Sequence, residues 1–158
     1  MNTVTHALIP VICVRLAARR PPWLGRWGLV LIGVAGALPD LLTPHLSLES
    51  RMASWSHGIP CWLLFSSILV AISLMKRGRF HLALALCLSA AYLLHMACDV
   101  ISGGVNLLYP FGDWVIGEYW VDPSWWIPLD VVCILLCYLL FRIIPGLAGR
   151  KAAEPNED

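Results

Sequence analysis

A histidine and an aspartate, His95 and Asp99, lie four residues apart near the end of an apolar run. If the run is helical, this spacing places both side chains on one face, with Cβ atoms about 6 Å apart. An imidazole and a carboxylate at that separation can share one metal ion, and the alternative is a pair that only hydrogen-bonds. Gly103, Gly104 and Pro110 follow, so the helix is predicted to end just beyond Asp99.

Three more residues of ligand type occur at the ends of other apolar runs. Asp40 ends the stretch GVAGALPD, His57 lies in SWSHGIPCWLL, and His6 follows Thr5 near the start of the chain. Each has an ordinary alternative: Asp40 as a turn cap, His57 as an interfacial residue in an aromatic belt, and His6 as a solvated side chain. Considered together, the five residues predict a metal site formed by His6, Asp40, His57, His95 and Asp99.

The composition indicates which elements must position these residues. The 158 residues are 59% hydrophobic and 13% charged, with a mean hydropathy of +0.74. Runs near 20 apolar residues are long enough to cross a bilayer core of about 30 Å. We therefore expect an all-α polytopic membrane bundle of about five helices, over residues 4–18, 27–42, 58–75, 80–100 and 126–144. Residues 1–145 would form the membrane-embedded domain with the metal site, and 146–158 a short polar cytoplasmic tail.

The positive charges predict the orientation of this bundle. Ten of the eleven Lys and Arg residues fall in the stretches 15–26, 76–79 and 142–151, and only Arg51 does not. Lys and Arg collect in cytoplasmic loops of membrane proteins, so the N-terminus is predicted outside and the C-terminus inside. At ~1.5 Å per helical residue, Asp40 then lies ~21 Å above Arg26 and Asp99 ~30 Å above Arg79. The candidate ligands share one outer slab.

Ionisable side chains at this depth are costly and usually face the bundle interior, where they mark functional sites. A divalent cation is the simplest shared partner for two carboxylates and three imidazoles. Asp130, in WWIPLD, is predicted to accept a hydrogen bond from a ligating histidine, a supporting role that carboxylates often fill. The net charge of +1 implies nothing about nucleic acid, and because no basic stripe with interleaved aromatic residues appears, no nucleic-acid partner is expected. The six cysteines lie mostly in apolar segments, where a thiol acts as a small hydrophobe.

The order of these motifs resembles the YdjM-like family of inner-membrane proteins described as metal-dependent hydrolases. The resemblance rests on Thr5-His6, Leu38-Pro39-Asp40, Ser56-His57-Gly58, His95 with Asp99, and Pro110-Phe111. This family is distantly similar to zinc-dependent phospholipase C and P1 nuclease. That similarity implies a main site of Asp40, His57, His95 and Asp99, and a partial second site of His6 and Asp99.

The function expected from these observations is hydrolysis. A bound divalent metal, zinc by its mixed nitrogen and oxygen ligands, would lower the pKa of its water toward about 7. One ion, or two, would act on an ester, in particular a phosphoester, of an amphiphilic or lipid-linked substrate at the extracytoplasmic face. The catalytic group would be water, with no side-chain nucleophile assigned. The alternative is a non-enzymatic protein, an ion transporter or a structural partner, that uses the same polar cluster. The sequence does not indicate an oligomeric state.

Overall fold

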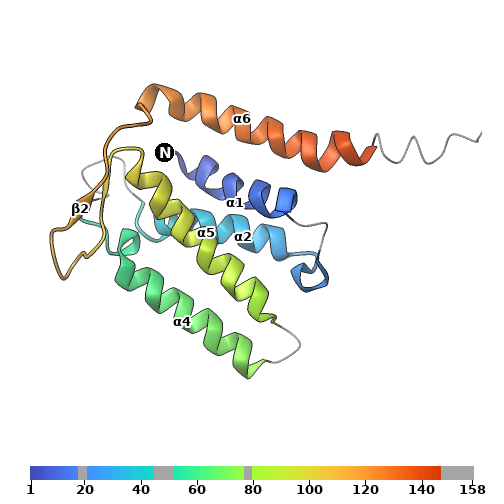
Figure 1. Cartoon of the computed structure of the whole chain (residues 1–158), viewed down its shortest axis with the longest axis horizontal. Helices are drawn as coiled ribbons and strands as arrows, with labels where there is room; N and C mark the ends of the chain where they lie inside the picture. The colour runs from blue at the N-terminus through green and yellow to red at the C-terminus, as the bar shows by residue number, and fades with distance from the viewer. Residues whose placement is uncertain (18–20, 45–51, 77–79, 147–158) are drawn as a thin grey trace, which may run out of the picture.

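The computed structural model describes residues 1–17, 21–44, 52–76 and 80–146. This part of the chain contains five α-helices (Figure 1): α1 (Thr3–Ala17), α2 (Gly28–Leu42), α4 (Ile59–Met75), α5 (Leu82–Val100) and α6 (Trp126–Tyr138). A π-helical turn, η4 (Leu139–Ile143), extends α6. The helical character and the five segments agree with the sequence prediction. Apart from residue 146, the tail predicted over residues 146–158 lies outside the described residues.

The second helix ends where the sequence predicts. Helix α2 ends at Leu42, with Pro39 inside its last turn. A proline within a helix removes one backbone donor, here the one that would bond the carbonyl oxygen of Ala35. Asp40 follows Pro39 within the helix, and its side chain projects from the last turn.

The connection between α5 and α6 contains structure that the apolar pattern did not predict. Strand β1 (Val105–Asn106) pairs antiparallel with β2 (Val115–Ile116), with Val105 opposite Ile116. Gly117 has φ of +121°, and a Cβ there would lie 2.2 Å from the carbonyl oxygen of Val100. Only glycine permits this approach. The ladder thus holds the connection against the end of α5, next to Asp99.

Short 3-10 turns complete the chain: η1 (Pro22–Leu24), η2 (Trp55–His57) and η3 (Pro123–Trp125). In η3, the exposed Asp122 side chain accepts a hydrogen bond from the backbone N–H of Ser124 at 2.8 Å. Hydrogen bonding from Ser124, first from its side chain and then from its backbone N–H, lowers the pKa of Asp122. Among these turns, η2 matters most for the site because it contains His57.

Helix α5 is the centre of the bundle, packed against α2 and α4, and α1 lies between α2 and α6. The core beneath the site is apolar and comprises Leu24, Ile32, Ala35, Leu84, Leu88 and Ala91. A polar contact joins α4 to α5, where Ser66 and Ser89 hydroxyls are 2.6 Å apart and Trp62 Nε1 donates to the Ser89 carbonyl. Small residues let α1 and α2 approach: a Cβ on Gly36 would lie 2.4 Å from the carbonyl oxygen of His6.

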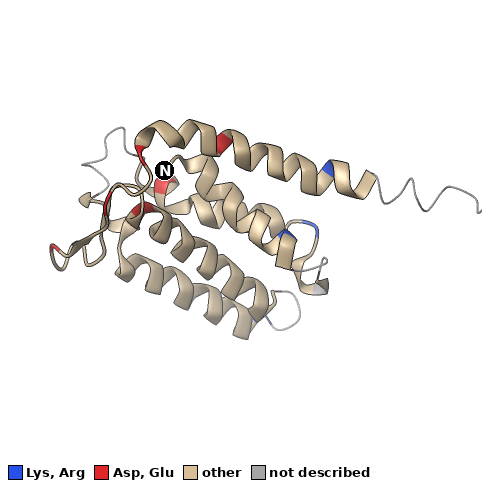
Figure 2. Cartoon of the chain, turned by 45° about the horizontal axis from the view of Figure 1, so that its top comes forward, with Lys and Arg blue, Asp and Glu red and all other residues tan. Residues whose placement is uncertain are grey.

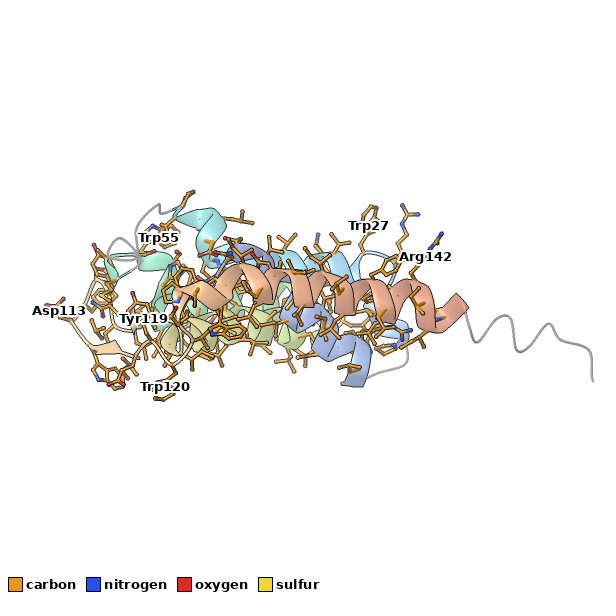
Figure 3. All side chains as sticks on the ribbon, turned by 90° about the horizontal axis from the view of Figure 1, so that it is seen from above. Trp27, Trp55, Asp113, Tyr119, Trp120 and Arg142 are labelled. Carbon is orange, nitrogen blue, oxygen red and sulfur yellow. The ribbon has the colours of Figure 1, made fainter. Side chains whose placement is uncertain are left out.

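The two ends of the bundle differ in charge. In Figure 2 the described Asp and Glu residues gather at the end nearest the N-terminus, apart from one on α6, and the described Lys and Arg residues lie toward the other end. Exposed aromatic side chains occur at both ends: Trp55, Tyr119 and Trp120 at the acidic end and Trp27 at the basic end, where Arg142 also lies (Figure 3). This distribution is the pattern that membrane interfaces impose on helical bundles.

Within the described residues, two helical stretches are long and apolar enough to cross a membrane, Leu82–Val100 and Pro123–Gly146. Helices α1, α2 and α4 are shorter apolar helices of 15, 15 and 17 residues. At ~1.5 Å per residue, 15 residues extend over ~22 Å. Each of the three is therefore shorter than the ~30 Å hydrocarbon core.

Candidate metal centre

The five predicted ligands come together from four separate stretches of chain. His95 and Asp99 project from α5, Asp40 from α2, His57 from η2 and His6 from α1. His6, His57, His95 and Asp99 are each at most 2% exposed. The side chain of Asp40 is 14% exposed, so Asp40 is the member of this cluster that borders the surface.

Candidate donor atoms group into two triads that share His95. One, the Asp40 triad, consists of Asp40, His57 and His95, and the other, the His6 triad, of His6, His95 and Asp99. Within each triad the ligand atoms lie within 4.8 Å of one another. The resemblance implied a main site of Asp40, His57, His95 and Asp99 and a partial second site of His6 and Asp99. In the structure, Asp99 lies near His57 and His95 and also near His6.

The Asp40 triad is closely spaced. Nε2 of His57 is 3.3 Å from Oδ1 of Asp40 and 3.2 Å from Nε2 of His95. The distance from His95 Nε2 to Asp40 Oδ1 is 3.5 Å. Three donor atoms that belong to three elements therefore face one small volume.

Asp99 has one oxygen toward each triad. Its Oδ2 lies 3.2 Å from His95 Nε2 and 3.5 Å from His57 Nε2. Its Oδ1 lies 3.2 Å from His6 Nε2. The α-amine of Met1 approaches the same Oδ1 at 3.5 Å and donates to the Ser102 hydroxyl at 2.7 Å. Asp99 is consequently the carboxylate that links the two triads.

The orientation of His95 follows from its second ring nitrogen. Nδ1 lies 2.7 Å from the carbonyl oxygen of Gly36, and because a carbonyl only accepts, Nδ1 must be the donor. A neutral His95 then presents the lone pair of Nε2 to Asp40, Asp99 and His57. Lone pairs facing one another are repulsive unless a proton or a cation lies between them. This is the fixed-tautomer arrangement that metal-ligating histidines use.

His57 is oriented by hydroxyl groups. Its Nδ1 lies 2.9 Å from Ser54 Oγ and 3.2 Å from Ser56 Oγ. Ser56 Oγ in turn donates to the Pro39 carbonyl at 2.8 Å, so it can only accept from the imidazole. Burial lowers the pKa of His57 despite the hydrogen bond to Asp40, which raises it. The neutral ring, the form that binds metals, is thereby favoured.

His6 packs against the face of His95. The two rings stack with centroids 3.8 Å apart and planes inclined by 28°. Nδ1 of His6 is buried and has no hydrogen-bond partner. A buried polar atom without a partner is costly, and here it lies next to a group of donor atoms.

Asp130 has partners other than the predicted ones. Its Oδ1 accepts from the backbone N–H of Thr5 at 3.0 Å and from the Thr5 hydroxyl, and its Oδ2 accepts from Asn2 Nδ2 at 2.7 Å. The expectation that it would accept from a ligating histidine is therefore wrong. The carboxylate binds the first turn of α1, one residue before His6, and supports the site through the backbone.

Four supporting residues were not found from the sequence. They are Thr3, whose hydroxyl donates to Asp40 Oδ2 at 2.7 Å, together with Gly36, Ser54 and Ser102. The hydroxyl residues lie within three residues of a ligand, which is a weak signal. The Gly36 carbonyl has no sequence signal because every residue has one.

The donor chemistry fits a divalent cation. Two histidines and a carboxylate, with one position left for water, form a common catalytic zinc set. Because His95 has one available nitrogen, the two triads compete for it. The geometry therefore fits one ion better than two.

The comparison with protein families shows to which family the chain belongs. The YdjM inner membrane protein family matches residues 1–153. The chain belongs to this family. Its description agrees with the apolar helices and places the chain in the cell inner membrane. No curated protein and no solved structure matches the chain, so the relation to zinc-dependent phospholipase C and P1 nuclease is not shown.

Proposed function

We propose that this YdjM family protein is a membrane-bound metal-dependent hydrolase whose cation is held by the Asp40 triad, with Asp99 beside it. The observation that carries the proposal is the fixed tautomer of His95. Its Nδ1–H is committed to the Gly36 carbonyl, so Nε2 is the nitrogen that faces two carboxylates and a second imidazole, and in the neutral ring it offers them a lone pair. A zinc-like divalent ion satisfies all of these groups.

A divalent ion at this position would supply Lewis-acid chemistry, activating water and neutralising the charge that develops on an ester oxygen. The protein groups would do the rest. Ser54, Ser56 and Gly36 hold the two imidazoles in orientation, and Thr3 donates to Oδ2 of Asp40. The low exposure of the cluster excludes bulk water, which strengthens electrostatic interactions inside it.

The charge distribution supports an extracytoplasmic site in a multi-pass bundle. The site lies at the end that is rich in Asp and Glu, and the described Lys and Arg residues lie toward the opposite end (Figure 2). By the positive-inside rule, the basic end is cytoplasmic. An amphiphilic substrate with a phosphoester head group would reach such a site from the outer leaflet.

The core favours hydrolysis over ion transport. The residues directly below the site, from Ile32 and Ala35 on α2 to Leu88 and Ala91 on α5, form an apolar cluster. A transporter needs polar groups along the route to the other side. Below the site, the described parts of α4 and α5 offer an ion few polar side chains beyond serines such as Ser66, Ser73 and Ser89.

Metal analysis of the purified protein tests the first step. We expect about one divalent ion per chain in the wild type, because His95 has a single nitrogen available to bind a metal. His95→Ala should lose that ion. His81→Ala is the matched control, because His81 lies exposed at the other end of the same helix. Equal metal content in all three proteins would refute the proposal.

Two further variants separate the triads. His57→Ala changes only the Asp40 triad and His6→Ala only the His6 triad. We expect His57→Ala to lose the metal and His6→Ala to retain most of it. The reverse result would move the ion to the His6 triad.

Hydrolysis is tested with bis(p-nitrophenyl) phosphate and with a phospholipid in mixed micelles. Activity should be lost on chelation, return with added zinc or manganese, and be absent in His57→Ala. Metal binding without hydrolysis of either probe would favour the non-enzymatic alternative.

A further inference from the structure

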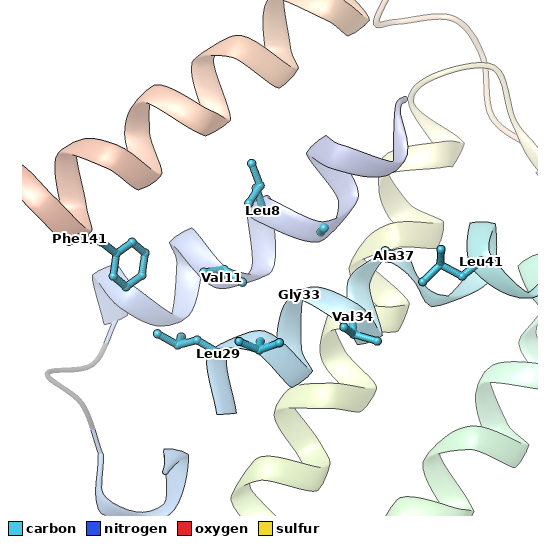
Figure 4. A pocket seen from close by; sticks show the side chains of 10 residues that line it. Leu8, Val11, Leu29, Gly33, Val34, Ala37, Leu41 and Phe141 are labelled. Atoms are coloured by element: carbon cyan, nitrogen blue, oxygen red, sulfur yellow. The ribbon is translucent and has the colours of Figure 1, made fainter. Parts of the chain in front are cut away.

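An apolar groove of about 430 Å³ lies beside the metal centre, between α1, α2 and the end of α6. Figure 4 shows its lining, with Leu41 and Ala37 at one end and Phe141 and Leu29 at the other. Every residue that lines it is apolar or glycine. Its volume is within the range of sites that bind small molecules, roughly 300–1,000 Å³.

The groove follows one stripe of α2. Val30, Val34, Ala37 and Leu41 recur at intervals of three and four residues and so share a helical face, and Val30, Val34 and Leu41 are exposed. Gly33 forms part of the floor, where a Cβ would approach the Ala7 carbonyl to 3.4 Å. The stripe is hollow because this position has no side chain.

One end of the groove adjoins the metal centre. Asp40 follows the lining residue Ala37 by three residues and directly precedes Leu41. Asp40 is also the cluster member with an exposed side-chain surface, and its Oδ2 accepts from Thr3. The polar end of an amphiphile in the groove would therefore meet Asp40.

The length of the groove matches one lipid tail. From Leu29 to Leu41 the helix rises ~18 Å at ~1.5 Å per residue. One leaflet of a ~30 Å hydrocarbon core is ~15 Å deep. A single acyl chain would extend along the groove with its head group at the acidic end of the bundle, where the outer interface is proposed.

We infer that this groove binds an acyl chain of a phospholipid and presents its phosphoester to the metal centre. The inference rests on the proposed function, because it names the substrate class of the same site. The groove selects for a straight hydrocarbon chain by shape and polarity. The centre selects for the phosphate by charge.

Photo-crosslinking tests the groove without relying on catalysis. The full chain is reconstituted in nanodiscs that contain phosphatidylglycerol with a diazirine in the middle of one acyl chain, and adducts are mapped by peptide. We expect labelling of the groove residues of α1 and α2 to exceed labelling of exposed α4 residues, such as Leu63 and Leu64, several-fold.

Matched variants sharpen the test. Val34→Trp fills the groove, whereas Leu31→Trp adds the same bulk at a similarly exposed α2 position outside it. Val34→Trp should reduce groove labelling several-fold and Leu31→Trp should not. Val30→Trp is a second filling variant in case Val34→Trp does not fold. Uniform labelling of all exposed helices would overturn the inference. Equal groove labelling in the wild type, the filling variant and Leu31→Trp would also overturn it.

Metal content measured in the same samples distinguishes the two failures. Normal metal content with uniform labelling would refute the groove alone. If the wild-type protein contained no metal but its groove residues were still preferentially labelled, the metal centre would be refuted. The groove would then be an acyl-chain site without an associated reaction. Normal metal content in Val34→Trp also shows that the variant is folded.

Discussion

Helix α5 and the α6 region are the two described helical stretches long enough to cross a membrane, and they are used in opposite ways. Half of the α5 stretch is buried within the protein, against 6% of the stretch that contains α6. Helix α5 contains His95 and Asp99 and packs on two neighbours. Helix α6 contacts mainly α1, through Asp130 at one end and through Leu140 and Phe141, which contact Arg15, at the other.

This difference shows what positions a helix when lipid is the solvent. Hydrocarbon tails are as apolar as leucine, so burial of apolar side chains gives little reason for helices to associate there. Polar contacts and close packing decide instead. Helix α5 has several polar partners and lies at the centre of the bundle. Helix α6 is attached to α1 where Asp130 makes its polar contacts.

The largest effect is expected where α2 closes on α1 and α5. In Gly36→Ala the new Cβ would meet the His6 carbonyl at 2.4 Å and Pro10 at 2.8 Å. Separation of the helices should cost about 1–3 kcal/mol and disturb the carbonyl that orients His95, so metal content should fall. Thermal unfolding and metal analysis measure both.

Gly33→Ala is the control for Gly36→Ala, because its Cβ would meet Ala7 and Val11 atoms only at 3.4 Å. It should keep its metal. If both variants behaved like the wild type, close contact between α1 and α2 would not be what positions the site.

A smaller effect is expected from the polar attachment of α6. Asp130→Ala removes the acceptor of Thr5 and Asn2. This change frees the first turn of α1, where the Thr3 hydroxyl donates to Asp40. Loss of such supporting groups lowers metal affinity by about 10-fold or more. Competition with a chelator measures this, and Asp113→Ala, at an exposed loop position, is the control. Equal affinities in both variants would limit α6 to a structural role.

The pH dependence of the protein's stability should follow the protonation of His57, the buried histidine of η2. Because burial lowers the pKa of His57, the unfolded chain takes up a proton below about pH 6.5 that the folded protein resists. The metal-free protein is therefore expected to lose stability as the pH falls below this value, and the metal should dissociate over the same range. Melting temperatures at pH 7.5 and 5.5 test the sign. His57→Gln should show a weaker dependence, and greater stability in acid would contradict the assignment.

The smallest effect is expected on the exposed side of α6. Ile134 is 52% exposed, so Ile134→Ala should change stability in nanodiscs by no more than about 0.5 kcal/mol. The comparison is Leu88→Ala on α5, which removes a side chain from the packed core. Equal losses would show that α6 has a protein partner on that side.

The parts of the fold that depend on local pattern could be predicted from the sequence. The helices were expected over residues 4–18, 27–42, 58–75, 80–100 and 126–144, and the observed bounds agree within two residues apart from the π-helical continuation of α6. The strands β1 and β2 could not be predicted, because two residues have no periodicity to detect. They depend on Gly117, which permits contact with Val100.

For the site, the sequence alone determined the ligand types and their shared depth, because charge and hydropathy set where polar side chains can lie in a membrane. Only the tertiary structure decided their grouping into two triads around His95, the Gly36 carbonyl that fixes its tautomer, and the attachment of Asp130 to Thr5. The contacts between elements join residues 17 to 125 positions apart, and they depend on how closely the helices approach. Helix packing sets that distance, and hydropathy does not.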